Sequence, residues 1–217
     1  MQLIIGEKNY SSWSLRAWFM VAKAGLDFQE VPLPLDTEQF YREIVKYNPA
    51  AKVPTLIDND ITVWDSLAIC EYVNETYLNG NAWPSTPKLR AKARAIASEM
   101  HSGFNAVRNE MPMNIRAKRH VDLSDDAIKD IIRIDKIWSQ QMDNYAEKGG
   151  WLFGDWSIAD VMFVPVIMRF KTYQVQLSEK SQAYMAFVLK DPELNRWIAD
   201  ALKETTIVAM DEAGVDV

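Results

Sequence analysis

The sequence of 217 residues predicts a mixed fold, in which an α/β domain is followed by an all-helical domain. Up to about residue 80, short apolar or alternating segments typical of strands alternate with helical patterns. A cluster of Gly, Asn, Pro and Ser then runs from Asn79 to Pro87, which is typical of a domain boundary. Beyond this cluster the apolar residues recur at helical spacing. We therefore expect one domain over residues 1–80 and a second over residues 84–217.

The first domain contains seven predicted elements in the order β-α-β-α-β-β-α. An apolar strand at residues 3–5 precedes a helix over residues 12–23, which Gly25 ends as a C-cap. An alternating strand, a polar helix, a hairpin of two β-branched strands and a closing helix follow at residues 28–33, 37–47, 55–57, 61–64 and 66–78. This order, with its crossover and its closing hairpin, suits the thioredoxin-like fold.

The hairpin begins at Val53-Pro54. A proline at the start of a strand cannot donate to the ladder, so it leaves the backbone beside it open. In a cis Val53-Pro54 bond, the amide and carbonyl of Val53 would point outward together and could pair with a docked peptide. Only about 5–6% of X-Pro bonds in folded proteins are cis, so local geometry alone makes this the minority form.

Asp65 and Ser66 follow the hairpin and precede the apolar run Leu67–Ile69, a pattern typical of a helix N-cap. The amides of this helix N-terminus can hold a carboxylate, and Asp65 offers a negative partner for an ammonium group. Together with the open backbone at Val53, these seats describe a site for a small γ-linked peptide with an amino-acid head.

The motif NPxxxVPTL at residues 48–56, followed by DSLAI at residues 65–69, resembles the glutathione-binding half of cytosolic glutathione S-transferases. The resemblance implies a cis Pro54 after Val53 that anchors the cysteinyl backbone of glutathione. It also implies that Asp65 and Ser66 grip the γ-glutamyl group. Lys52 stands where this family often has a glutamine or lysine near the glycine end of glutathione. An ammonium there would meet the glycine carboxylate, whereas a solvated loop lysine is the alternative.

The segment SSWSLR at residues 11–16 is similar to the SSCSWR pattern of zeta-class transferases, the maleylacetoacetate isomerase group. The resemblance places the catalytic serine on Ser11, with Ser12 as its neighbour. Trp13 replaces the cysteine of that pattern, which reshapes the thiol pocket and argues against unchanged isomerase chemistry. Helix capping is the alternative role for both serines, and Tyr10 is a third side chain that could face the thiol.

Hydroxyl groups at the start of a helix can activate a thiol. A free thiol has a pKa of about 8.5, and lowering it by about two units requires roughly 2.7 kcal/mol of preference for the thiolate. One charge-assisted hydrogen bond together with the helix dipole can supply this preference. The protein would thus activate a nucleophile that glutathione carries.

The second domain is predicted to contain helices at residues 88–104, with a continuation to Met111, at 124–148, at 157–173 and from Asp191 onward. Ser157 and Asp160, in GDWSIAD, form a capping box that again resembles the transferase family, and we expect a structural role for them. Pro165 should kink its helix or lie against a neighbouring helix end.

Isolated reactive residues of the sequence fit structural roles. Cys70 is the only cysteine, so the chain can form no internal disulfide, and without a CxxC pair we expect a buried, inert thiol. Two histidines, His101 and His120, indicate no metal site. Arg16 is expected to pair with a carboxylate of the second domain, with a surface charge as the alternative. Arg108 and Arg169 could meet an acidic second substrate, with salt bridging as the alternative.

The composition excludes several classes of function. The net charge of −6 argues against a nucleic-acid partner. The sequence shows no signal peptide and no apolar run long enough to span a bilayer, so we expect a cytoplasmic protein.

The resemblance implies a homodimeric glutathione transferase that binds reduced glutathione as cosubstrate and activates its thiol for attack on a small electrophile. A glutathione-dependent isomerase, a peroxidase or reductase, and a non-catalytic protein-binding member of the family are the alternatives. The helical domain sets the electrophile, which the sequence does not identify.

Overall fold

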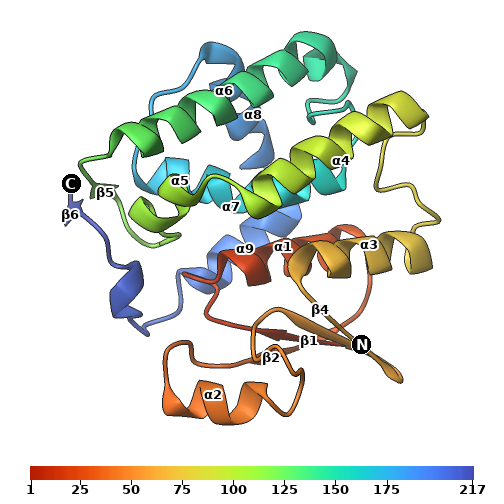
Figure 1. Ribbon diagram of the computed structural model, residues 1–217, viewed down its shortest axis with the longest axis vertical. Helices are drawn as coiled ribbons and strands as arrows, with labels where there is room; N and C mark the ends of the chain where they lie inside the picture. Colours follow the sequence, from red (N-terminus) through yellow and green to blue (C-terminus); the bar gives the residue numbers. More distant parts are fainter.

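The computed structural model describes residues 1–217 and contains a mixed sheet of four strands, in the order β2-β1-β3-β4 (Figure 1). The strands are β1 (Gln2–Ile5), β2 (Gln29–Pro32), β3 (Thr55–Asp58) and β4 (Ile61–Trp64). β1 runs parallel to β2 and antiparallel to β3, and β3 pairs with β4 in the predicted hairpin. The apolar strand β1 therefore lies inside the sheet, as its continuous hydrophobic run predicts.

Three helices cover the two faces of this sheet: α1 (Ser12–Lys23), α2 (Glu38–Ile44) and α3 (Ser66–Tyr77). Figure 1 shows α1 and α3 on one side of the strands and α2 on the other. The alternation of side chains along β1 fits this arrangement, because Leu3 and Ile5 join the main core, whereas Ile4 packs with Phe40 and Ile44 under α2. The predicted order β-α-β-α-β-β-α and the thioredoxin-like fold are confirmed.

The rest of the chain is mainly helical. It contains α4 (Pro87–Ser102), α5 (Asn105–Glu110), α6 (Asp125–Tyr145), α7 (Ile158–Thr172), α8 (Glu179–Val188) and α9 (Pro192–Ala201). The expected continuation of the first of these helices to Met111 is wrong. The helix α4 ends at Ser102, with Gly103 as its C-cap, and Phe104 adopts a left-handed backbone with φ of 59° before α5 begins. α6 ends at Tyr145, where a short 3₁₀ turn (Ala146–Lys148) replaces its predicted last residues.

Three features of this helical part are absent from the sequence prediction. The helix α8 carries only Tyr184 and Val188 as buried apolar residues, so its helical pattern is weak. A second 3₁₀ turn (Ala209–Asp211) lies near the C-terminus. Two-residue strands β5 (Arg119–His120) and β6 (Val215–Asp216) pair antiparallel, so the segment after α9 returns to the start of α6. No helix is both long enough and apolar enough to cross a bilayer.

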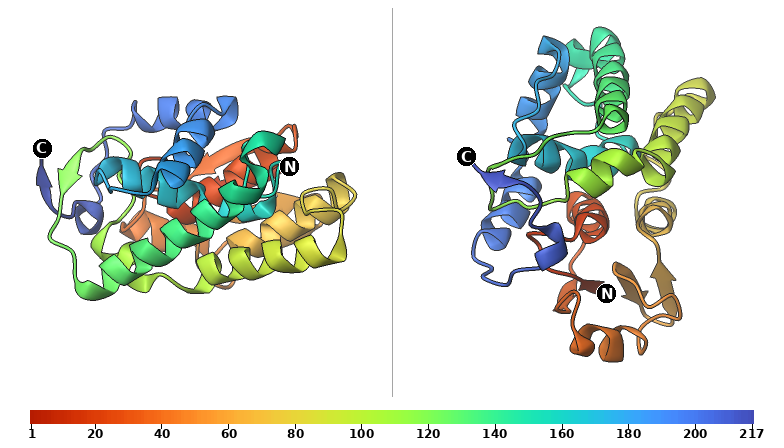
Figure 2. Two further views of the ribbon diagram at one scale, coloured as in Figure 1. Left: turned by 90° about the horizontal axis from the view of Figure 1, so that it is seen from above. Right: turned by 60° about the vertical axis from the view of Figure 1, so that its left-hand side comes forward.

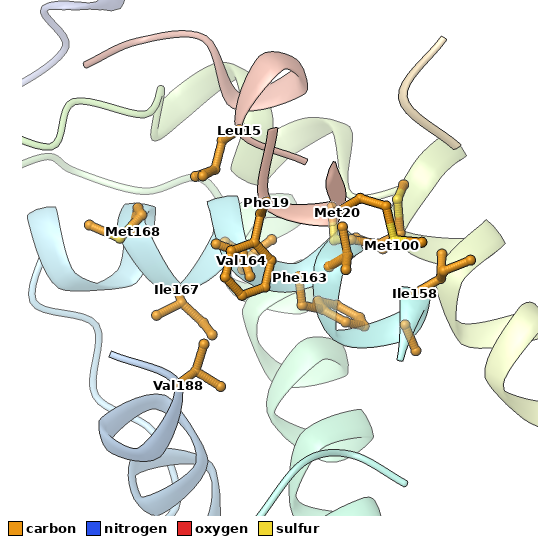
Figure 3. Packing of buried hydrophobic residues seen from close by; sticks show 14 of the residues in the cluster. Leu15, Phe19, Met20, Met100, Ile158, Phe163, Val164, Ile167, Met168 and Val188 are labelled. Atoms are coloured by element: carbon orange, nitrogen blue, oxygen red, sulfur yellow. The ribbon is translucent and has the colours of Figure 1, made fainter. Parts of the chain in front are cut away.

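The helix α7 is the centre of the core. Its residues are buried on nearly every side, including Pro165, which the helix accommodates without ending. Figure 3 shows Phe19 of α1 beside Val164 and Ile167 of α7, with Val188 of α8 below them. One continuous cluster of buried apolar residues runs from Leu3 to Ala201, so the sheet-bearing and helical parts share a core. The boundary at residues 80–84 stays a prediction.

Asp160 anchors the start of α7. Its fully buried carboxylate accepts hydrogen bonds from Ser157 N (2.9 Å), Ser157 Oγ (2.9 Å), Leu152 N (3.0 Å) and Tyr184 Oη (3.0 Å). Burial raises the pKa of Asp160 to about 6, and these four donors partly oppose the increase. The residue lies away from both cavities described below, which fits the structural role expected from the sequence.

Lys8 joins the two parts of the chain. Its buried ammonium group lies 2.7 Å from Glu30 and 2.9 Å from Asp200 of α9. The same group lies 5.2 Å and 5.3 Å from the ring centroids of Trp18 and Trp197. Because Glu30 belongs to the edge strand β2, Lys8 links α9 to the sheet.

Candidate functional site

A cavity of about 430 Å³ lies between the loop before β3 and the starts of α1 and α3. Its lining includes all five residues that the sequence assigned to binding of the peptide: Lys52, Val53, Pro54, Asp65 and Ser66. Trp13, Ala50 and Trp64 complete it, and no sequence motif pointed to the last two. The structure therefore brings the predicted binding residues together.

The Val53-Pro54 peptide bond is cis. No hydrogen bond within the protein uses the backbone N–H or C=O of Val53, so both groups are free to pair with a ligand. The buried side chain of Asn48 holds the loop that leads to this point, since its amide donates to the carbonyl of Lys52 (2.9 Å) and contacts the hydroxyl of Thr55. The side chain of Lys52 itself is exposed.

Asp65 is the N-cap of α3 and has a left-handed backbone, with φ of 73°. Its Oδ1 accepts from the amides of Leu67 (2.8 Å) and Ala68 (3.2 Å), and its Oδ2 lies 3.2 Å from Nε2 of His101 on α4. The sequence led us to expect free amides at this helix N-terminus. Two of them, those of Leu67 and Ala68, are not free, because they already donate to Asp65. The carboxylate remains half-exposed and can still accept from a ligand.

Ser66 offers an unpaired hydroxyl and an unpaired amide at the same helix N-terminus. Its side chain is fully buried at the cavity wall, and its Oγ has no hydrogen-bond partner in the protein. Its amide also has no acceptor. A buried hydroxyl without a partner is uncommon and costs free energy, so it points to a group that binds here.

A second cavity of about 360 Å³ adjoins the first and shares Trp13 and Val53 with it. Tyr10, Ser11 and Ser12 line it at the start of α1. The other lining residues come from four further segments of the chain: Leu35, Arg108, Asn109, Pro112, Arg169 and Asp211. The predicted catalytic serines thus lie beside the predicted binding residues, in the neighbouring cavity.

Ser11 is the N-cap residue of α1, but the side chain of neither serine accepts a backbone amide of the helix. The Oγ of Ser11 lies 2.7 Å from Oγ of Ser14, which also accepts the amide of Gly6 at 3.1 Å. The Oγ of Ser12 accepts from Nη2 of Arg169 at 3.1 Å, which leaves its own proton free to donate.

The first turn of α1 consequently keeps unpaired amides. No side chain caps the helix, and the N–H groups of Ser12, Trp13 and Ser14 have no acceptor. These three groups and the helix dipole create positive potential at the wall of the second cavity.

Tyr10, the third candidate, is held by other partners. Its hydroxyl donates to Glu212 at 2.5 Å and accepts from Arg116 at 3.0 Å. Burial and the Glu212 carboxylate raise the pKa of Tyr10. The tyrosine therefore holds Glu212, near the C-terminus, in place.

Two arginines of the second cavity lack ionic partners. Arg108 donates to the carbonyls of Gly103 (2.8 Å) and His101 (3.2 Å), and Arg169 donates to the carbonyl of Arg108 (3.1 Å). No carboxylate lies within ion-pair distance of either, so the salt-bridge alternative is wrong. Burial lowers the pKa of both guanidinium groups, that of Arg169 to about 10, and Arg169 is protonated at neutral pH.

The expectation for Arg16 is also wrong. Its fully buried guanidinium donates from Nε to the carbonyl of Met162 (3.0 Å), and no carboxylate pairs with it. It stacks on the indole of Trp13 at 4.5 Å, and Arg108 lies 4.8 Å from the same ring. The Trp13 ring, which both cavities share, is thereby fixed by two cations and by the edge of His101 at 5.4 Å.

The solitary thiol and the second histidine take no part in either cavity. Cys70 is fully buried in α3, and burial raises its pKa well above the ordinary range of a thiol. His120 is exposed on β5, where it lies 3.5 Å from Asp122.

The sequence is similar to those of known proteins. Residues 10–76 fit the family model described as glutathione S-transferase, N-terminal domain. A probable maleylacetoacetate isomerase from Caenorhabditis elegans is 28% identical over 169 residues, which cover 77% of this chain and 78% of that protein.

Solved structures agree in fold. The holo structure of a maleyl pyruvate isomerase, a bacterial zeta-class transferase, superposes with a TM-score of 0.71 at 20% identity, over 95% of this chain and all of that one. A glutathione transferase homologue from Burkholderia GL BGR1 with bound glutathione superposes with a TM-score of 0.70 at 21% identity, over 92% and 96% of the two chains. Residues 10–76 thus resemble the N-terminal domain of glutathione S-transferases, and the chain as a whole shares the fold of these solved structures.

Proposed function

We propose that the protein is a glutathione transferase, which binds reduced glutathione in the first cavity and activates its thiol for attack on a small electrophile in the second. The observation that carries this proposal is the junction of the two cavities. There the free backbone groups of Val53 lie next to the start of α1, where three amides have no acceptor. A peptide held along Val53 would place its side chain toward these amides.

The first cavity fits glutathione group by group. Val53 offers one amide and one carbonyl to the backbone of the cysteinyl residue, in the manner of an added strand. The hydroxyl and amide of Ser66 hold the γ-glutamyl carboxylate, and Asp65 accepts from the γ-glutamyl ammonium. Lys52, exposed at the rim, pairs with the glycine carboxylate.

The serines act on the sulfur. Glutathione supplies the nucleophilic thiol, and Ser12 can donate to the thiolate because Arg169 already satisfies its oxygen. Ser11 can do the same when Ser14, which accepts from Gly6, turns its own proton toward Ser11. These hydrogen bonds, the α1 dipole and the nearby guanidinium groups all favour the ionised sulfur.

Once the thiolate has formed, a substitution reaction at the electrophile needs no further catalytic side chain. The sulfur forms a bond to an electrophilic carbon with its own electron pair, and the leaving group departs as an anion. The proton of the thiol is lost to solvent when the thiolate forms.

Two measurements test the role of the serines. The first is the ultraviolet absorbance of the bound thiolate as a function of pH, which reports the thiol pKa directly. The second is conjugation of 1-chloro-2,4-dinitrobenzene. We expect the pKa of bound glutathione to rise in Ser12→Ala, in Ser11→Ala or in both, with a matching loss of rate at neutral pH. Unchanged pKa and full activity in both variants would contradict the proposal.

A glutathione-dependent isomerisation of an acidic substrate is the second candidate. The observation in its favour is that Arg108 and Arg169 line the second cavity without ionic partners, so they could bind a carboxylate. Trp13 stands where the zeta-class pattern has cysteine, which counts against it. Turnover of a cis-unsaturated keto acid to its trans isomer, dependent on glutathione, would favour this candidate over simple conjugation.

We further propose that the protein works as a homodimer in the cytoplasm. Its family resemblance supports the dimer, and its single, fully buried thiol suits a reducing compartment. Light scattering at micromolar concentration tests the oligomeric state.

A further inference from the structure

We propose that Asp211 is a specificity-determining residue of the second cavity. Its carboxylate disfavours electrophiles that place a negative charge next to Arg169. The inference rests on the proposed function, since it concerns the second substrate of the same site. It depends on the segment after α9, residues 203–217, which we call the C-terminal segment.

The C-terminal segment is tied down on both sides of Asp211. Before it, Arg116 donates to the carbonyls of Glu204 and Thr206. After it, β6 pairs with β5, and the amide of Val217 donates to the carbonyl of Lys118 at 3.2 Å. Figure 2 shows this segment, in dark blue, returning beside the loop that leads into α1.

Glu212 makes the closest attachment to the site. Its carboxylate accepts from Tyr10 Oη (2.5 Å), from Asn114 Nδ2 (2.9 Å) and from a guanidinium nitrogen of Arg119. Tyr10 directly precedes Ser11 and Ser12 in the chain. Its hydrogen bond to Glu212 therefore fixes the position of the neighbouring Asp211 relative to these serines. The position of Asp211 is therefore set by the fold.

The carboxylate of Asp211 forms no interaction that holds the fold together. It makes no hydrogen bond and no ion pair, although it is half-buried and lines the second cavity with Arg108 and Arg169. The segment is held by the backbone of Asp211, whose amide donates to Val208 at 2.9 Å, and by the side chain of Glu212. A partly buried carboxylate without a partner, facing a cavity, is suited to act on a ligand.

The charge state of Asp211 follows from its surroundings. Its pKa is raised to about 6, chiefly by burial; Arg169 opposes this increase, and the carboxylates of Glu212, Asp36 and Glu7 add to it. At pH 7.5 the group is ionised. An anionic substituent that approaches Arg169 then meets the negative charge of Asp211 as well. If such a substituent lies about 7 Å from the Asp211 carboxylate and the effective dielectric constant is about 40, removal of this charge changes the preference for the substituent by about five- to tenfold.

The test uses two electrophiles that differ in charge and hardly in shape, 4-chloro-3,5-dinitrobenzoate and 4-chloro-3,5-dinitrobenzamide. The measured quantity is the ratio of their kcat/KM values with glutathione at pH 7.5. We expect Asp211→Asn to raise the ratio of benzoate to benzamide about five- to tenfold. Asp216→Asn is the matched control: this carboxylate belongs to the same segment, pairs with Arg119 and is exposed, and its loss should leave the ratio unchanged.

A binding measurement separates this inference from the proposed function. The affinities of 3,5-dinitrobenzoate and 3,5-dinitrobenzamide are compared by calorimetry in the presence of saturating S-methylglutathione, with no reaction required. If neither chloro compound is turned over by the wild type, conjugation fails as the function, but the binding ratio still reports on Asp211. A ratio that changes less than twofold in Asp211→Asn, or equally in Asp216→Asn, overturns the inference.

Discussion

Replacement of Ser66 by alanine should separate the binding of glutathione from the stability of the protein. The hydroxyl of Ser66 is fully buried and has no partner, so its removal breaks no hydrogen bond in the free protein. An unsatisfied buried polar group costs about 1–3 kcal/mol, and we expect Ser66→Ala to be as stable as the wild type or more stable.

The affinity should change in the opposite direction. A hydrogen bond to a charged group contributes about 1.5–3 kcal/mol, so loss of the bond to the γ-glutamyl carboxylate should raise the Kd for glutathione roughly 10- to 150-fold. Calorimetric titration at pH 7 measures this change, and urea denaturation measures the stability of the same samples.

A second buried serine provides the control. Ser181 is equally inaccessible but donates to the carbonyl of Asp135 at 3.1 Å, far from both cavities. Ser181→Ala should therefore lose about 1 kcal/mol of stability and keep its affinity for glutathione. If Ser66→Ala binds glutathione as tightly as the wild type, or is destabilised as much as Ser181→Ala, the assignment of Ser66 to the ligand is refuted.

Three further predictions concern the core and its titratable groups. Asp160→Ala leaves several buried donors unpaired and should cost at least about 3 kcal/mol by urea denaturation, whereas Asp126→Ala, at an exposed site, should change stability by less than about 0.5 kcal/mol. Cys70, whose pKa burial raises, should react with a disulfide reagent at pH 8 only after unfolding; rapid labelling of the native protein would contradict this. Burial lowers the pKa of His101, so the neutral form stabilises the fold above about pH 6.5 and this contribution is lost as the pH falls through the native pKa. Wild type should thus lose stability relative to His101→Gln between pH 6.5 and 5, and parallel pH profiles would argue against it.

The first cavity was predictable because its residues are close in the sequence. The open backbone at Val53 and the start of the helix at Ser66 lie 13 positions apart, and the hairpin between them has strong local signals. The pair Asp65-Ser66 predicted a helix N-cap, but the sequence did not show which of the two residues caps the helix, since both types are common at that position.

The second cavity was only partly predictable, because six separate segments of the chain build it. The serines were visible as a motif, and Arg108 and Arg169 as candidates, but their lack of ionic partners depends on packing between α1, α5 and α7. Asp211 has no local signal at all, since it reaches the cavity only through the attachments of its neighbour Glu212.

The fold shows the same division between local and distant causes. The hairpin and the long helices follow from periodicity, whereas the break after α4 places Phe104 in a conformation that bulky residues rarely adopt. Tertiary packing imposes that conformation against the local preference.

The apolar core shared by the two parts of the chain has a consequence for how the molecule responds to its ligand. Because Phe19 and Met20 of α1 pack against α7, and Lys8 bridges to α9, neither part keeps its buried surface when the other is lost. Unfolding should then be one cooperative event. A tripeptide that contacts only the thioredoxin-like half should therefore raise the melting temperature of the whole protein. Conversely, a destabilising mutation at the far end of α7 should lower the apparent affinity for that tripeptide.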